Sequence, residues 1–256
     1  MAQIHLDFHS DVLQHAANVI VVLPQKAGTR IGMEGEQGAQ FRTLWLLHGL
    51  SDDHTIWARH TSIERYAAAY GIAVVMPNGG RSWYTDMAHG EAYYTYITEE
   101  LPRVCRSFFR GMSDRREDNY VAGLSMGGYG ALKIAFRNPD RYAGAAAFSG
   151  ALNVCESHFC RENPAYWSDI FGDLATLPGS DNDVYALATR LAASEGPRPR
   201  LYLSCGTEDG LLGDNRKMHA LLDGEGIDHT YREAPGMHNW AFWDAEIQHA
   251  LAFMFG

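Results

Sequence analysis

The chain contains 256 residues, of which 46% are hydrophobic and 20% are charged, and its formal net charge at pH 7 is −10. This length and composition are typical of one large globular domain with a sizeable core. The negative charge and the absence of long Lys or Arg runs argue against nucleic acid or an anionic membrane surface as a partner. No apolar stretch reaches membrane-spanning length, and the first residues lack the pattern of a signal peptide, so no membrane partner is expected.

Two strands are predicted near the N-terminus. Residues 4–8 alternate between apolar and polar side chains, which indicates a half-buried strand. A second apolar run covers residues 18–23 and ends at Pro24. Residues 28–38 are polar and rich in glycine, which predicts a loop or the tip of a hairpin.

Beyond residue 43, short apolar runs alternate with helical patterns. Apolar strands that alternate with helices indicate an α/β protein with a mainly parallel sheet and helices on both faces, to which the first strands can pair antiparallel. Pro102 is expected to kink or break the helix that contains it. We expect strands over 44–47, 72–76, 120–122, 143–148, 200–204 and 229–233, and helices over 62–70, 93–109, 127–136 and 240–253.

Residues 150–199 form a long stretch with weak strand signals. We expect this stretch to be a cap-like insertion over the active site, within a single domain that covers residues 1–256. The apolar pairs at 166–167 and 170–171 are its predicted anchors.

The four cysteines do not predict a metal site or a disulfide framework. Cys105, Cys155, Cys160 and Cys205 fit no common zinc spacing, and a chain of this size does not depend on disulfides. Reduced thiols in a cytoplasmic protein are expected, with a Cys155–Cys160 bridge as the alternative. Neither H-E-x-x-H nor H-x-H occurs among the twelve histidines, so no metal and no cofactor are expected.

The segment 123–127 has the sequence Gly-Leu-Ser-Met-Gly, which is the G-x-S-x-G pattern of a nucleophile elbow. An apolar run precedes it and a helical pattern follows it, as this sharp turn between a strand and a helix requires. Gly123 and Gly127 remove side chains that would clash at the turn. Ser125 would then stand at a helix N-terminus, where the dipole favours developing negative charge. Ser125 is therefore the predicted nucleophile.

A serine hydroxyl needs a base, and the base needs a carboxylate that orients it. In hydrolases with this elbow the carboxylate follows the serine in the chain. Glu208, Asp209 and Asp214 all follow the predicted strand at 200–204. Asp209 is preferred because it lies just beyond the strand end and precedes a glycine, whereas Glu208 fits a solvated acidic turn better.

The histidine base is expected last in the chain. Of the four histidines after Asp209, His219 and His249 lie on helical patterns and His229 opens a strand. Only His238 lies in a loop after the last predicted strand, next to glycine. His238 is therefore the predicted base.

The oxyanion of an acyl-transfer reaction needs two N–H donors. One is expected from Met126, the residue after the nucleophile, and the other from the loop that begins with His48. Gly49 would let the backbone approach the substrate, and the Leu50 N–H is the candidate donor. His48 is expected to support this loop and to take no part in catalysis.

A resemblance to known enzymes is carried by seven segments, residues 46–51, 75–78, 83–86, 99–102, 122–130, 148–151 and 236–240. These segments resemble the α/β-hydrolase esterases of the esterase D group, and more closely the bacterial tributyrin esterases. The resemblance implies the α/β-hydrolase fold and a cytoplasmic carboxylesterase that acts on small-molecule esters with short acyl chains, often as a homo-oligomer. It also implies that Ser125, Asp209 and His238 form the triad.

Several alternatives stay open at this point. S-formylglutathione hydrolases look similar around 48–50 and Ser125 but differ from this chain over 78–83, and feruloyl and acetyl-sugar esterases share the scaffold. Trp83 and Tyr84 either line the substrate pocket or are core aromatics. A binding protein that has lost catalysis would usually lack a triad member, and a metal hydrolase would need ligand motifs that are not seen.

Overall fold

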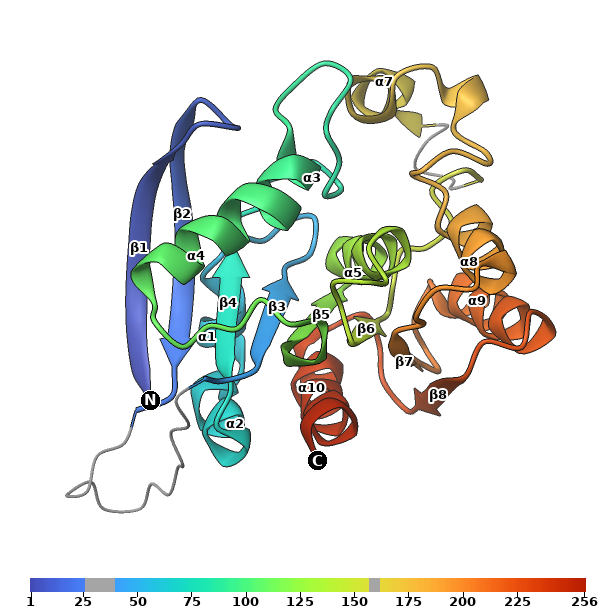
Figure 1. Cartoon of the computed structure of the whole chain (residues 1–256). Coiled ribbons are helices and arrows are strands. Elements are labelled where there is room, and N and C mark those ends of the chain that lie inside the picture. Colours follow the sequence, from blue (N-terminus) through green and yellow to red (C-terminus); the bar gives the residue numbers. More distant parts are fainter. Residues whose placement is uncertain (26–39, 157–161) are drawn as a thin grey trace.

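The computed structural model of the chain describes residues 1–25, 40–156 and 162–256. In these residues one eight-stranded sheet runs through the molecule in the order β1-β2-β4-β3-β5-β6-β7-β8 (Figure 1). β2 pairs antiparallel with β1 and with β4, and the other neighbouring strands are parallel. The strands are β1 Ala2–Ser10, β2 His15–Leu23, β3 Thr43–Leu47, β4 Ala73–Pro77, β5 Asn119–Leu124, β6 Gly144–Phe148, β7 Arg200–Gly206 and β8 His229–Ala234.

Helices cover both faces of the sheet, which confirms the predicted α/β architecture (Figure 1). α1, α2 and α10 pack on one face, and α4, α5, α8 and α9 pack on the other. The helices in the described residues are α1 Ile56–His60, α2 Ile63–Tyr70, α3 Tyr93–Thr95, α4 Leu101–Phe108, α5 Met126–Arg137, α7 Pro164–Phe171, α8 Val184–Ala193, α9 Leu212–Gly224 and α10 Trp240–Phe255.

The central strands are apolar throughout because each of their faces lies on a separate core. In β3, Trp45 and Leu47 belong to the core beneath α5, whereas Leu44 and Leu46 belong to the core beneath α10. β1 lies at the edge of the sheet and alternates between half-buried and exposed residues, as predicted. The period of two in β1 and the continuous apolar run in β3 therefore reflect one-sided and two-sided burial.

The helix predicted over 93–109 changes type just before Pro102. The α-helical turn α3 is followed by a π-helical turn, Tyr96–Glu100, and then by α4, which begins one residue before the proline. Proline has no N–H and so cannot donate to the carbonyl of Thr98, four residues earlier. The Arg141 guanidinium donates to that carbonyl. The helical path therefore continues through the proline with a changed hydrogen-bonding pattern.

The stretch 150–199 contributes to two different parts of the molecule. α8 packs against α5 and α9 and so belongs to the helical layer. α7 lies beyond the carboxyl ends of the parallel strands (Figure 1). The carbonyls of Asp169 and Ile170 in α7 accept hydrogen bonds from His89 N–H (2.8 Å) and Ala88 N–H (3.0 Å). α7 is therefore attached to the loop that follows β4.

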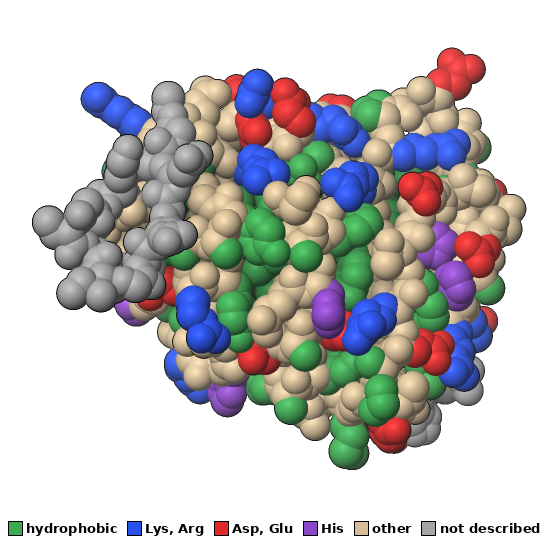
Figure 2. All heavy atoms as spheres, turned by 90° about the horizontal axis from the view of Figure 1, so that it is seen from below, with side chains coloured by type: hydrophobic (Ala, Val, Ile, Leu, Met, Phe, Trp, Pro, Cys, Tyr) green, Lys and Arg blue, Asp and Glu red, His purple; other side chains and the backbone are tan. Residues whose placement is uncertain are grey.

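Two predictions fall outside the described residues: the loop at 28–38 and the state of Cys160. In the described part of the chain, no helix is long and apolar enough to cross a membrane. Figure 2 shows the face at the amino ends of the parallel strands, where Lys and Arg side chains are interspersed with acidic and apolar ones.

Candidate active site

Ser125 stands in a tight turn between β5 and α5. Its backbone has φ 53° and ψ −117°, a conformation that L-residues rarely adopt. A Cβ on Gly123 would lie 2.4 Å from the Gly127 carbonyl group, and one on Gly127 would lie 2.6 Å from the Leu47 carbonyl oxygen. Both glycines are therefore required by close backbone contacts, as the sequence predicted.

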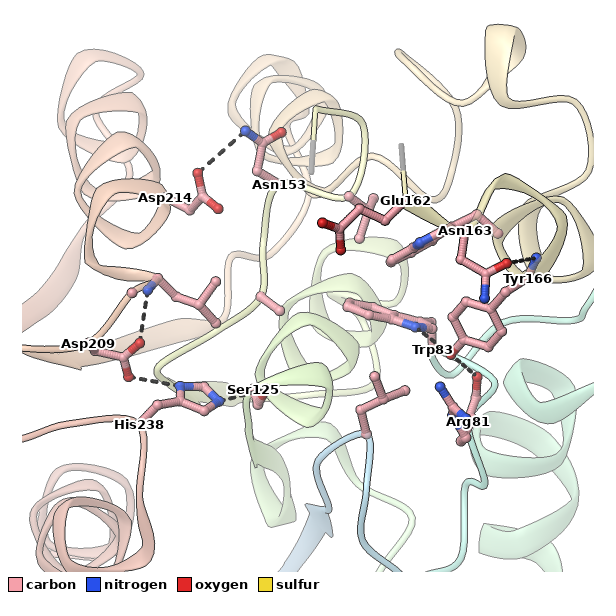
Figure 3. A pocket seen from close by; sticks show the side chains of 16 residues that line it. Arg81, Trp83, Ser125, Asn153, Glu162, Asn163, Tyr166, Asp209, Asp214 and His238 are labelled. Atoms are coloured by element: carbon pink, nitrogen blue, oxygen red, sulfur yellow. Dashed lines mark hydrogen bonds and ion pairs between the residues drawn. The ribbon is translucent and has the colours of Figure 1, made fainter. Parts of the chain in front are cut away.

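Ser125, His238 and Asp209 form a continuous chain of hydrogen bonds (Figure 3). His238 Nε2 lies 3.1 Å from Ser125 Oγ, and His238 Nδ1 lies 2.8 Å from Asp209 Oδ2. A carboxylate can only accept, so the imidazole N–H is on Nδ1 and the lone pair of Nε2 faces the serine. The three residues follow β5, β7 and β8, so the parallel sheet brings them to one edge.

The surroundings of Asp209 favour its ionised form. Burial raises the pKa of this carboxyl, but hydrogen bonds from His238, from the Leu211 N–H and from Ser149 lower it by more than burial raises it. The net pKa is therefore below the ordinary value. Ser149, which directly follows β6, was not predicted as a site residue. Its own hydroxyl accepts a hydrogen bond from Trp243 Nε1 at 3.1 Å.

Glu208 and Asp214, the other candidate carboxylates, do not contact His238. Glu208 accepts a 2.6 Å hydrogen bond from the Gly236 N–H, which together with the Thr207 hydroxyl lowers the pKa of its carboxyl. Glu208 is exposed in a turn, as expected for a solvated acidic turn residue, and it also connects the loop after β7 to the loop of His238. A Cβ on Gly206 would lie 2.1 Å from the Gly236 carbonyl oxygen, so these loops also touch through their backbones.

His48 supports the loop after β3, as expected. Its Nε2 accepts from the Gly79 N–H at 2.9 Å, which leaves Nδ1 to donate to the Gly49 carbonyl at 2.7 Å. Burial lowers the pKa of His48 despite this second bond. A Cβ on Gly49 would lie 2.8 Å from Leu124 Cδ1, so glycine lets this loop approach the elbow.

Leu50 and Met126 present the two candidate oxyanion donors beside Ser125. Met126 is the first residue of α5, where N–H groups have no partner within the helix. In the described parts of the chain, neither N–H donates to a backbone acceptor. Both N–H groups are therefore without a backbone acceptor in the described residues, as the donors of an oxyanion site must be.

A cavity of about 490 Å³ opens over Ser125 and His238. Trp83, Tyr166 and Arg81 lie on one side of it, and Asn153 and Asp214 lie across from them (Figure 3). The cavity thus combines an aromatic wall with a polar one.

The adjacent residues Trp83 and Tyr84 have different roles. Trp83 lines the cavity, and its Nε1 donates to Tyr166 Oη at 3.1 Å. Tyr84 is fully buried, with its hydroxyl donating to the His48 carbonyl at 2.9 Å. Its predicted substrate contact is therefore wrong, and it is a core aromatic. Gly49 does not line the cavity either, because it is buried against Leu124.

Several residues that line the cavity were not predicted as site residues. Tyr166 and Trp167 were predicted only as apolar anchors, yet both line the cavity. Arg81 stacks on the Tyr166 ring at 4.8 Å, and Tyr166 donates to the Arg81 carbonyl at 3.0 Å. The only available signal was that Trp83, Tyr166 and Trp167 are aromatic. Their pairing could not be predicted, because residues so far apart in the chain are brought together by the tertiary fold.

Comparisons with known proteins agree with this fold. A family model described as "Putative esterase" matches residues 10–254. An acetyl esterase of Caldicellulosiruptor saccharolyticus is 32% identical over 264 residues, which cover 99% of this chain and 98% of the relative. The solved structure of a fluorophosphonate-binding serine hydrolase of Staphylococcus aureus, FphF, is 34% identical with a TM-score of 0.88, covering 100% of this chain and 98% of its own.

An S-formylglutathione hydrolase from Staphylococcus aureus, FrmB, is also 34% identical, with a TM-score of 0.83, and covers 100% of this chain and 99% of its own. The fold and the site define a serine hydrolase with the α/β-hydrolase fold. Within this class the chain belongs to the esterase family that its sequence matches. The protein is a carboxylic ester hydrolase.

Proposed function

We propose that the protein is a serine carboxylesterase that hydrolyses short-chain acyl esters through an acyl-enzyme intermediate, as the tributyrin esterases that it resembles do. The observation that carries this proposal is the hydrogen-bond chain from Asp209 through His238 to Ser125 at the floor of a cavity. Ser125 is the nucleophile, His238 the base and Asp209 the group that orients it.

In the first half of the reaction, Ser125 Oγ attacks the ester carbonyl while His238 Nε2 takes its proton. The N–H groups of Leu50 and Met126 stabilise the negative oxygen of the tetrahedral intermediate. His238 then gives the proton to the departing alcohol. In the second half, His238 activates a water molecule that attacks the acyl-enzyme, and Ser125 is regenerated with release of the carboxylic acid.

The size of the cavity supports a short acyl chain. A volume of about 490 Å³ is in the lower half of the range for small-molecule sites, roughly 300–1,000 Å³, and the acyl and alcohol parts must share it. The 32% sequence identity with an acetyl esterase also supports a short acyl chain. The α7 part of the 150–199 insertion then acts as the cap of a single-domain enzyme.

A thioester substrate is the second candidate, because one similar structure is an S-formylglutathione hydrolase. The mechanism would be unchanged, with a thiol in place of the alcohol. The departure of residues 78–83 from the pattern of those enzymes favours the oxygen ester.

A chain-length series of p-nitrophenyl esters below their micelle concentrations, with acetylated sugars, feruloyl esters and S-formylglutathione beside it, tests the proposal. Each added methylene gains about 0.8 kcal/mol of transfer free energy until the pocket is full, after which overpacking costs energy. We expect kcat/KM to peak between acetyl and butyryl and to fall by octanoyl. A maximum at octanoyl or beyond would refute the short-acyl assignment, and a kcat/KM for S-formylglutathione above that for every oxygen ester would favour the second candidate.

A further inference from the structure

Two histidines and an aspartate meet at the surface between α9 and β8, away from the cavity. His219 and Asp223 are one helical turn apart on α9, and His229 is the first residue of β8. Because β8 is parallel to β5, its first residue lies at the opposite edge of the sheet from Ser125. None of the three residues lines the catalytic cavity.

The two imidazole rings are held in fixed orientations. His229 Nδ1 lies 2.8 Å from the Ile227 carbonyl and must donate to it, so the lone pair of the neutral ring is on Nε2. This Nε2 lies 2.7 Å from His219 Nδ1, and the His219 ring stacks on Tyr231 at 4.4 Å between centroids. Metal-binding histidines are typically held in this way, with the second ring nitrogen donating to a carbonyl.

The exposed carboxylate of Asp223 lies close to both rings. Its Oδ1 lies 3.9 Å from His229 Nε2, and its Oδ2 lies 3.6 Å from His219 Nε2. One donor atom from each of the three residues can be chosen so that all lie within 4.8 Å of one another. Asp223 is 64% exposed, whereas the His229 side chain is 3% exposed, so the carboxylate can adjust to an ion while His229 stays fixed.

We propose that His219, Asp223 and His229 form a binding site for a divalent transition-metal ion of the Zn²⁺ class. Two imidazole nitrogens and one carboxylate oxygen are a donor set that such ions favour, and solvent can supply the fourth position. Tetrahedral ligands at zinc distances are about 3.3 Å apart, so the two rings must separate by roughly half an ångström. His219 binds through Nδ1, and the proton from this atom is carried on Nε2, which faces Asp223 Oδ2.

A metal ion at this site would tie the end of α9 to the edge strand β8. The bidentate pair of Arg216 with Glu233, at 2.7 Å for both bonds, already joins the same two elements. The ion binds the folded chain and not the separated ligands of the unfolded chain, so it raises the unfolding temperature. The ester hydrolysis at the other edge of the sheet does not use it.

The test is calorimetric titration of the chelator-treated, full-length protein with Zn²⁺, together with Co²⁺ absorption spectroscopy as a probe of coordination. We expect one saturable equivalent, with Co²⁺ d–d bands, and a rise of about 5 °C in the unfolding midpoint at 100-fold excess over Kd. His219→Gln should abolish binding and Asp223→Asn should weaken it about tenfold or more. Esterase activity should be the same with EDTA and with Zn²⁺.

His249→Gln is the matched control, because His249 is an exposed histidine on α10. Its Zn²⁺ titration should match that of the unchanged protein. Asp223 is exposed, so the Asp223→Asn variant keeps the test valid if a histidine variant fails to fold. The proposal is overturned if no saturable equivalent is found, if His219→Gln and Asp223→Asn bind Zn²⁺ as the unchanged protein does, or if the control loses binding equally.

Discussion

Two loops at the carboxyl edge of the sheet each carry a histidine, and the two histidines have opposite surroundings. His48, which is 1% exposed, bonds through both ring nitrogens to backbone groups. His238 bonds through Nδ1 to the Asp209 carboxylate and through Nε2 to the Ser125 hydroxyl, beside an open cavity. Both nitrogens of the first ring are occupied by backbone groups, whereas the second ring lies between a carboxylate and a hydroxyl that can give up its proton. The atoms at the ring nitrogens therefore distinguish a supporting histidine from the histidine that we propose as the base.

The largest expected effect on activity comes from replacing Ser125, the hydroxyl partner of His238. Ser125→Ala removes the nucleophile, and loss of a triad nucleophile lowers kcat on the order of 10⁶-fold in a well-studied protease. The measurement is p-nitrophenyl acetate hydrolysis by protein whose fold is verified by circular dichroism. Ser107→Ala, in an exposed position of α4, is the control and should keep full activity. Activity of Ser125→Ala within tenfold of the parent would contradict the assignment.

The next largest effect on activity comes from replacing Asp209, the carboxylate partner of His238. Asp209→Asn should lower kcat by about 10⁴-fold, because the amide no longer holds the imidazole in its working tautomer. Glu208→Gln should stay within about tenfold, since Glu208 only connects two loops through the Gly236 N–H. Steady-state kinetics of both variants decides the matter. If the two effects are exchanged, the orienting carboxylate has been misassigned.

The two histidines themselves should separate stability from activity. His48→Leu leaves the buried Gly79 N–H and Gly49 carbonyl without partners, which should cost about 2–4 kcal/mol in the free energy of unfolding. His238→Gln should abolish hydrolysis and change stability by less than about 1 kcal/mol, because the ring is partly exposed. Urea unfolding of each variant beside its kcat tests this. A His48→Leu protein that is as stable as the parent but inactive would contradict the purely supporting role of His48.

The smallest effect is on the pH dependence of stability. The pKa of His48 is lowered in the folded state, so between its folded and unfolded values the unfolded chain binds the extra proton. This contribution to stability is complete above the unfolded histidine pKa, about 6.5, and is lost as the pH falls toward the folded value. Asp209 acts in the same direction at lower pH. The urea midpoint should fall less from pH 8 to pH 5.5 in His48→Leu than in the parent, and equal falls would contradict a neutral, buried His48.

The strands, the turn at Ser125 and the roles of the two histidines could be predicted from sequence, because they depend on the order of elements and loops along the chain. Apolar runs gave the strands, and glycines around Ser125 indicated a turn that tolerates no Cβ. Loops that follow parallel strands must converge at one edge, so Asp209 and His238 could be chosen over nearby carboxylates and histidines. The structural interpretation of His48 followed from the same reasoning.

Sequence patterns could not separate neighbours that differ only in tertiary surroundings. Trp83 and Tyr84 are adjacent aromatics, and both have positive φ, so their side chains do not follow a strand or helix period. The cavity wall made by Tyr166 depends on where α7 docks. His219 and His229 are ten residues apart with a turn between them, and only the packing of α9 on β8 brings their rings together.

The contact between Gly206 and Gly236, together with the Glu208 bond to the Gly236 N–H, joins the two loops at one side of the cavity independently of the wall opposite. Asp209 and His238 are carried by two loops that are locked to each other, so the proton-transfer geometry exists before any ester arrives. The opposite wall is held by α7, through two backbone hydrogen bonds to residues 88 and 89 and through the hydrogen bonds of Tyr166 with Trp83 and Arg81. Divergence of substrate range in this lineage, or by laboratory selection, would therefore accumulate on α7 and leave the chemical step unchanged.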